Sequence, residues 1–310
     1  MNLRALASRL FTLRKILVVG VVGTIALVTL VLARFYISDD VRVLGGLQRA
    51  LGWNREAYNG ELAKKVAAHR GYGGPENTIK SIQSAIDKGA TMIEVDVRWC
   101  KDGWILFHDE TAKSLANSSG GELIANMDLE AIRKLQGSVE FENERIVFFE
   151  TALSEFQSNN IVWLVDIKDT GSTDELLSIL RKFDVREGQS KFLLLARYEV
   201  IEQYKDSGFP LGYCAGFSKE WNAAKFLFGH SFILKNSEAL GQDLQCVVLP
   251  SPFLRTELIA DAHSRGLEVW GYSVRKEWDD AKEHQAWLAK GVDGLIVDDL
   301  PAGLELLGGQ

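Results

Sequence analysis

The stretch from Val66 to Asp109 decides the fold, and it reads VAAHRGYGGPENTIKSIQSAIDKGATMIEVDVRWCKDGWILFHD. It contains three short apolar runs that end in, or carry, charged residues. Such a run is typical of a buried strand whose polar tip opens into a site. The first run ends at His69, the second carries Glu94 and Asp96, and the third ends at His108.

Glu94 and Asp96 are two residues apart, so in a strand their side chains point to the same side. Two carboxylates inside an apolar run repel each other and are costly to bury, and a divalent cation between them removes that cost. Oxygen ligands favour a hard ion, so we expect Mg²⁺ or Ca²⁺. The histidines of the same stretch then suggest a proton donor and a proton acceptor.

The order of these motifs resembles the signature of the glycerophosphodiester phosphodiesterases, and the likeness runs from residue 64 to residue 305. Five matching motifs in the right order make a specific pattern, whereas one alone would be weak. They are His69-Arg70-Gly71 with Pro75-Glu76-Asn77-Thr78, Glu94-x-Asp96, His108-Asp109, Asp166-Ile167-Lys168, and the final strand Gly291-Val292-Asp293-Gly294-Leu295-Ile296-Val297-Asp298.

This resemblance implies metal ligands at Glu94, Asp96 and Asp166. Family members usually carry glutamate at the third position. Because aspartate is one methylene shorter, we expect the ion either to be shifted or to be reached through water, which makes Asp166 the weakest of the three ligands.

The resemblance also implies that His69 and His108 share the acid and base work, with the assignment of the two roles left open. Arg70 and Lys168 are expected to face the phosphate oxygens. Glu76 is expected to support Arg70 or the metal, whereas Asn77 and Thr78 are expected to begin a helix. Asp109 is expected either to orient His108 or to form a turn.

Other positions depart from the family pattern. Tyr272 stands where the family usually has tryptophan, so an aromatic wall of the substrate pocket is kept there. Arg275 stands where the family usually has asparagine, and it adds a cation near the pocket. The identity of the alcohol that leaves the phosphate is therefore left open.

From residue 64 to residue 310, short apolar runs alternate with amphipathic stretches, for example 77–88, 174–182, 256–265 and 278–290. This pattern predicts an α/β protein with a (β/α)₈ TIM barrel, whose active site lies at the C-terminal ends of the strands. The resemblance implies the same barrel. The predicted strands are 65–69, 92–97, 161–167, 191–196, 211–217, 245–249, 267–274 and 294–297. Lys101-Asp102-Gly103 is expected to form a hairpin-like turn.

The N-terminal part predicts a membrane protein. A basic tail (1–15) precedes a transmembrane anchor (16–36), whose residues 16–32 carry no charge, and a juxtamembrane connector (37–63) follows. A cleaved signal peptide and a buried core helix are the alternatives to the anchor. The connector is expected to form a helix, which lies either at the membrane surface or against the underside of the barrel. The basic tail predicts a single-pass protein with a cytoplasmic N-terminus and an extracytoplasmic catalytic domain.

Charge and cysteine content exclude other classes. The net charge is −7, and residues 1–35 hold five basic side chains and no acidic one, so the remainder has 30 basic against 42 acidic side chains, or −12. An acidic body argues against a nucleic-acid partner. The cysteines, Cys100, Cys214 and Cys246, match no metal spacing or disulfide framework and are expected to be small buried hydrophobes.

The resemblance implies metal-dependent hydrolysis of small glycerophosphodiesters to glycerol 3-phosphate and an alcohol. One alternative is a lysophospholipase D-like hydrolysis of lysophospholipids at the bilayer, suggested by the apolar segment 221–234. A catalytically silent, membrane-tethered binding module is a second alternative, and a lyase that releases a cyclic phosphate is a third.

Overall fold

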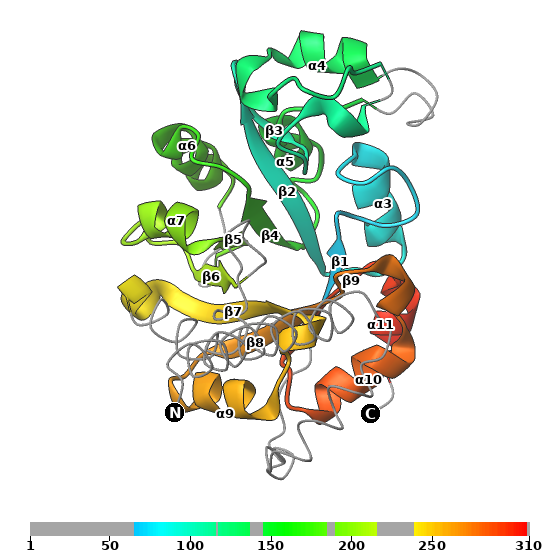
Figure 1. Ribbon diagram of the computed structural model, residues 1–310, viewed down its shortest axis with the longest axis vertical. Helices are drawn as coiled ribbons and strands as arrows, with labels where there is room; N and C mark the ends of the chain where they lie inside the picture. The colour runs from blue at the N-terminus through cyan, green and yellow to red at the C-terminus, as the bar shows by residue number, and fades with distance from the viewer. Residues whose placement is uncertain (1–64, 116, 137–144, 185–189, 216–238, 309–310) are drawn as a thin grey trace, which may run out of the picture. The chain divides into compact units, whose positions relative to one another are not determined.

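The strands form a closed barrel in the computed structural model, which describes residues 65–115, 117–136, 145–184, 190–215 and 239–308. β1 pairs in parallel with both β2 and β9, which closes the ring, and only β3 is antiparallel (Figure 1). The predicted TIM-type barrel is therefore confirmed. The strands are β1 (Lys65–His69), β2 (Met92–Cys100), β3 (Gly103–Leu106), β4 (Val162–Ile167), β5 (Phe192–Ala196), β6 (Leu211–Cys214), β7 (Leu244–Pro250), β8 (Glu268–Tyr272) and β9 (Gly294–Val297).

Helices lie outside the ring of strands, whereas α4 lies beyond the end of β2 that pairs with β3 (Figure 1). Four helices match amphipathic stretches predicted from the sequence, namely α3, α6, α9 and α10. The described helices are α3 (Ile79–Asp87), α4 (Leu129–Gln136), α5 (Phe149–Glu155), α6 (Thr173–Phe183), α7 (Tyr198–Ile201), α9 (Thr256–Ser264), α10 (Ala281–Ala289) and α11 (Leu300–Gly308).

The turn between β1 and α3 is held tightly against the helix. Thr78 caps α3, because its hydroxyl accepts from the Ser81 N–H and the Ser81 hydroxyl accepts from the Thr78 N–H, both at 3.1 Å. Gly71 has φ +88°, and a Cβ there would lie 2.5 Å from the Ser81 hydroxyl oxygen. Only glycine fits this position, and the turn that carries Arg70 is thereby fixed.

The barrel interior is apolar below its open end. Alternation along each strand sends one set of side chains inward and the other set toward the helices. The inward set is buried and includes Ala67, Leu164, Leu195, Cys246, Val248, Trp270 and Ile296. At the N-terminal end of the strands, Lys65 Nζ lies 2.5 Å from Glu268 Oε1. The carboxylates predicted as metal ligands therefore sit above a packed core, not in a pore.

Gly294 provides a test of this packing. A Cβ at this position would lie 2.2 to 2.5 Å from the Trp270 ring. Gly294→Ala is therefore expected to lower the free energy of unfolding by about 1–3 kcal/mol through overpacking. The measurement is urea denaturation beside Gly121→Ala, because a Cβ at exposed Gly121 would meet nothing within 4 Å. Equal stability of the two variants would contradict this packing.

The β2–β3 hairpin leads into a segment with its own small core. The predicted turn Lys101-Asp102-Gly103 is confirmed, because Cys100 pairs with Gly103 in antiparallel register. Residues that follow β3 pack on one face of this hairpin. This core comprises Cys100, Ile105, Phe107, Ala112, Leu115, Ile124, Leu129, Ile132 and Ile146. All the cysteines are free thiols, and of them only Cys214 is half-buried, the other two being buried as predicted.

The predicted basic tail, anchor and connector (1–15, 16–36 and 37–63) lie outside the described residues, as does the apolar segment 221–234. Within the described ranges, no helix combines the length and the apolar character needed to cross a bilayer. The membrane anchor therefore stays a prediction.

Candidate active site

Strand register brings the predicted site residues together. β1 and β2 are parallel neighbours with His69 opposite Glu94, and β2 and β4 are parallel neighbours with Asp96 opposite Asp166. Because Glu94 and Asp96 are two residues apart on β2, both face the inside of the barrel. The predicted convergence at the C-terminal ends of the strands is thus found for these four residues.

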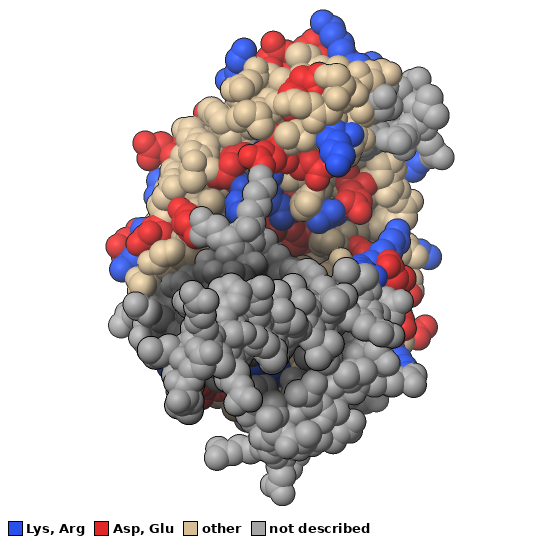
Figure 2. Space-filling model, in the orientation of Figure 1, with Lys and Arg blue, Asp and Glu red and all other residues tan. Residues whose placement is uncertain are grey.

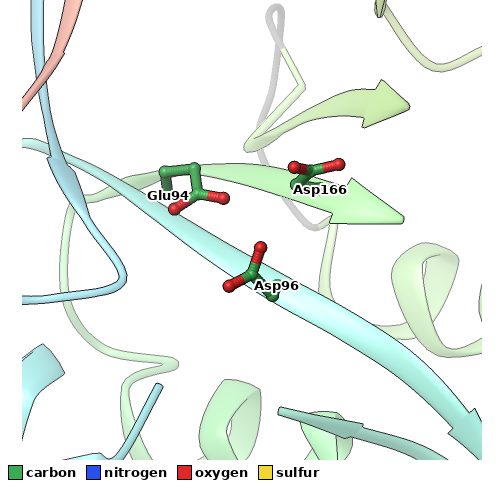
Figure 3. Close-up of side chains that lie close together, drawn as sticks. All are labelled: Glu94, Asp96 and Asp166. Carbon is green, nitrogen blue, oxygen red and sulfur yellow. The ribbon is translucent and has the colours of Figure 1, made fainter. Parts of the chain in front are cut away.

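The carboxylates of Glu94, Asp96 and Asp166 face a common space (Figure 3). One oxygen of each lies within 4.8 Å of the others. Glu94 is 3% exposed and Asp96 is fully buried, whereas Asp166 is half-buried. Within the described residues, this trio is the group of potential ligands close enough to hold a metal ion.

Burial and mutual repulsion perturb these acids. Burial, then the charge of Asp96, raise the pKa of Glu94 to about 8. Burial alone would raise the pKa of Asp96 too, but the charges of Lys168, Arg70 and His108 outweigh it and hold that pKa well below its usual range. Asp96 is therefore ionised, and Glu94 is the group that resists a second negative charge.

Two cations flank Asp96. Lys168 Nζ lies 2.7 Å from Asp96 Oδ1 and also contacts Asp166 Oδ2. Arg70 Nε lies 2.9 Å from Asp96 Oδ2, in a charge contact that lacks hydrogen-bond geometry. Arg70 and Lys168 were expected to face a phosphate, and in this structure both are paired with carboxylates, because buried Asp96 requires compensation of its charge.

Glu76 and Asn77 hold this arrangement from the turn before α3. Glu76 Oε2 accepts from Arg70 Nη1 at 2.6 Å, so it contacts Arg70, one of its two expected partners. Asn77 Nδ2 donates to Asp96 Oδ2 at 2.8 Å, and Asn77 Oδ1 accepts from the Asp96 backbone N–H at 2.9 Å. Sequence reasoning read Asn77 only as the start of a helix. The sequence signal that could have identified this contact is the place of Asn77 in the Pro-Glu-Asn-Thr motif.

His69 is held by a residue that sequence reasoning did not assign. Its Nδ1 lies 2.7 Å from Asp298 Oδ1, and its Nε2 lies 4.0 Å from Glu94 Oε2. Burial alone would lower the pKa of His69, but the Asp298 hydrogen bond and the charge of Glu94 leave it raised above its ordinary value. Asp298 directly follows β9, so the strand-end rule could have identified it.

His108 follows β3 and has two neighbours that orient it. Its Nδ1 lies 2.8 Å from Asp109 Oδ1. Arg98, on β2, donates from Nε and Nη2 to the His108 carbonyl at 3.2 and 2.7 Å, and from Nη1 to Asp169 at 3.1 Å. The expectation that Asp109 contacts His108 is met, whereas the role of Arg98 was not foreseen.

Tyr272 ends β8 and is half-buried beside the apolar interior of the barrel. Burial, then the neighbouring Cys214 thiol and the charge of Asp166, raise the pKa of Tyr272, so its side chain stays a neutral phenol. Figure 2 shows basic and acidic side chains side by side below the part of the molecule that carries α4. The site thus combines compensated charges with a half-buried tyrosine, and the aromatic wall expected at Tyr272 stays a prediction.

The residues present fit a hard divalent cation. All three candidate ligands offer oxygen, and Asp96 Oδ1 accepts no hydrogen bond within the described residues, its neighbour being the Lys168 ammonium. The raised pKa of Glu94 reports repulsion that a bound cation would relieve. Oxygen donors of this kind suit Mg²⁺ or Ca²⁺.

The fold and the site define a TIM-barrel protein with three clustered carboxylates and two histidines that each contact a further carboxylate. The profile of the glycerophosphoryl diester phosphodiesterase family matches residues 69–302. The chain therefore belongs to this family and is a phosphoric diester hydrolase.

Individual relatives agree. A glycerophosphodiester phosphodiesterase from Caldanaerobacter subterraneus is 25% identical over 248 residues, which cover 76% of this chain and 93% of that protein. A solved glycerophosphodiester phosphodiesterase from Thermotoga maritima shares the fold at a TM-score of 0.59 and 19% identity, covering 80% of this chain and all of that one. An Oleispira antarctica phosphodiesterase in complex with the product sn-glycerol-3-phosphate superposes at a TM-score of 0.60 and 20% identity, over 79% and 97% of the two chains.

Proposed function

We propose that the chain hydrolyses glycerophosphodiesters to glycerol 3-phosphate and a free alcohol, with His69 and His108 exchanging the protons. The observation that carries this proposal is the contact of His69 with Asp298 on one side and its approach to Glu94 of the carboxylate cluster on the other. The family match and the product-bound relative support the same substrate class.

The histidines supply the proton transfers. Asp298 binds Nδ1 of His69, which favours the tautomer with a proton on Nδ1 and leaves Nε2 to exchange a proton with a reacting oxygen. Asp109 binds His108 in the same way and directs its Nε2 away from Asp109. One histidine activates the attacking oxygen and the other protonates the departing alcohol.

The charged residues bind and stabilise the phosphoryl group. Glu94, Asp96 and Asp166 would hold a divalent cation, Mg²⁺ or Ca²⁺, which supplies Lewis-acid polarisation of the phosphoryl oxygens when bound. Arg70 and Lys168 contribute positive charge at the same edge of the barrel. Tyr272 forms the apolar wall against which the glycerol or the alcohol packs.

The alternatives have less support. The names of the relatives favour a glycerophosphodiester over a lysophospholipid, and the segment 221–234 that suggested a lipid lies outside the described residues. A silent binding module is disfavoured because both histidines and all three carboxylates are present. The membrane anchor at 16–36 would place the enzyme at a bilayer, and this part of the proposal rests on the sequence alone.

The test is release of choline by the full chain from glycerophosphocholine and, in parallel, from lysophosphatidylcholine. We expect turnover of the first substrate that depends on added Mg²⁺ or Ca²⁺ and stops with a chelator. Faster turnover of the lysolipid would replace the proposal with the lysophospholipase D-like alternative. The absence of turnover on either substrate would favour the binding module.

A further inference from the structure

Asp298 sits on a turn whose backbone must be fixed before its side chain can orient His69. It is the first residue after β9 and precedes α11, which starts at Leu300. Its carboxylate lies 2.7 Å from His69 Nδ1 and is partly exposed, with a side-chain exposure of 26%. A small shift of the turn would therefore move the carboxylate away from the imidazole.

A buried carboxylate from another loop holds this turn. Asp279 Oδ2 accepts from the backbone N–H of Asp298 at 2.5 Å and from that of Asp299 at 2.8 Å. The side chain of Asp279 is 1% exposed and comes from the loop between β8 and α10. Two consecutive backbone N–H groups thus donate charge-assisted hydrogen bonds to one carboxylate oxygen. These bonds fix both the position and the direction of the turn.

His284 holds the side chain of Asp279 in place. Its Nε2 lies 2.7 Å from Asp279 Oδ1, and its side chain is fully buried on α10. Its Nδ1 has no hydrogen-bond partner within the described residues. This pattern favours a proton on Nε2, donated to Asp279, because a buried lone pair without a partner is tolerated better than an N–H without one.

Carboxylates next to Asp279 and Asp298 in the sequence cap the first turns of α10 and α11. Asp279 is therefore not needed as a helix cap. Asp280 accepts from the Glu283 N–H at 2.9 Å and caps α10. Asp299 accepts from the Ala302 N–H at 3.2 Å at the start of α11. Asp279 instead reaches across to the end of β9, which is the strand end that bears Asp298.

We propose that Asp279, held by His284, is a positioning residue for the reaction: it fixes the backbone at Asp298 so that the Asp298 carboxylate orients His69. This inference rests on the proposed function. It extends the site by two buried residues that contact neither the carboxylate cluster nor His69 directly.

The experiment is a double-mutant cycle on glycerophosphocholine hydrolysis by the full chain, with kcat and KM measured for each protein. Asp279→Ala is expected to lower kcat roughly 10- to 100-fold with KM changed less than twofold, because the misplaced group is a proton carrier and not a binding contact. The kcat of Asp298→Ala is expected to fall by at least the same factor. The double variant should be no slower than Asp298→Ala, because Asp279 acts through Asp298.

Two further variants separate positioning from stability. Asp279→Asn should keep most of the wild-type kcat, because its Oδ1 still accepts the two N–H groups. Its melting temperature should fall, because donation from its Nδ2 to His284 requires the tautomer whose buried Nδ1–H has no partner among the described residues. Asp280→Ala removes the adjacent helix cap, so it should lower the melting temperature and leave kcat unchanged. If Asp279→Ala does not fold, Asp279→Ser takes its place, and a kcat reduced threefold or more is expected.

Wild-type kcat in Asp279→Ala or Asp279→Ser would overturn the inference, as would equal losses from Asp279→Ala in the wild-type and Asp298→Ala backgrounds. An inactive wild-type chain would instead overturn the proposed function, and the inference with it.

Discussion

Replacing His69 with alanine is expected to lower kcat for glycerophosphocholine hydrolysis about 10²- to 10⁴-fold, which is the usual contribution of a positioned acid or base. The imidazole is bound through Nδ1 to Asp298 and lies at the rim of the carboxylate cluster, so its loss removes a proton carrier without opening the core. The measurement is steady-state kinetics with saturating Mg²⁺ or Ca²⁺.

His263 provides the matched control. Its Nε2 lies 2.8 Å from Asp293 Oδ2, so it forms a histidine–aspartate pair of the same kind as His69 with Asp298. Asp293 precedes β9 whereas Asp298 follows it, and in this fold residues at the N-terminal ends of strands serve stability. His263→Ala should therefore lower the melting temperature and keep kcat. A loss of less than tenfold in His69→Ala would remove His69 from the proton-transfer scheme.

Asp96→Asn is expected to produce the second large effect, the loss of cation activation. Asp96 is fully buried between Glu94, Asp166 and two cationic side chains. Lewis-acid polarisation contributes several kcal/mol, so kcat should fall on the order of 10³-fold. Added Mg²⁺ or Ca²⁺ should raise the melting temperature of the wild type, by linkage of binding to folding, and leave that of Asp96→Asn unchanged.

Asp87→Asn is the control for charge removal, because Asp87 is an exposed carboxylate on α3 that accepts a hydrogen bond from Gln83 at 2.8 Å. It should retain both the activity and the cation-induced rise in melting temperature. The proposed ligand set would be contradicted if Asp96→Asn still showed the full rise.

The strand positions could be predicted from the sequence because each strand is a short apolar run bounded by charged or turn residues. The convergence of His69, Glu94, Asp96 and Asp166 followed from the rule that parallel strands of a barrel end on one face. The motif resemblance raised the odds that these residues form one site. The convergence of these residues could be predicted without knowing the order of the strands in the barrel.

Other contacts depend on tertiary structure and had no local signal. Asn77 reaches Asp96 from a left-handed backbone conformation with φ of 58°. Asp298 reaches His69 across 229 residues because β9 closes the ring against β1. The pairing of Arg70 and Lys168 with Asp96, in place of the expected phosphate, is an electrostatic result of burying that carboxylate.

The measurement that tests the central claim most directly is identification of the phosphorus-containing product by ³¹P nuclear magnetic resonance. The full chain would be incubated with glycerophosphocholine and Mg²⁺ or Ca²⁺, with chelator and with His69→Ala in parallel. Accumulation of glycerol 3-phosphate in step with the loss of glycerophosphocholine, absent in both controls, is the expected result. Accumulation of a cyclic glycerophosphate, or an unchanged substrate signal, would contradict a glycerophosphodiester hydrolase built on His69 and the three carboxylates.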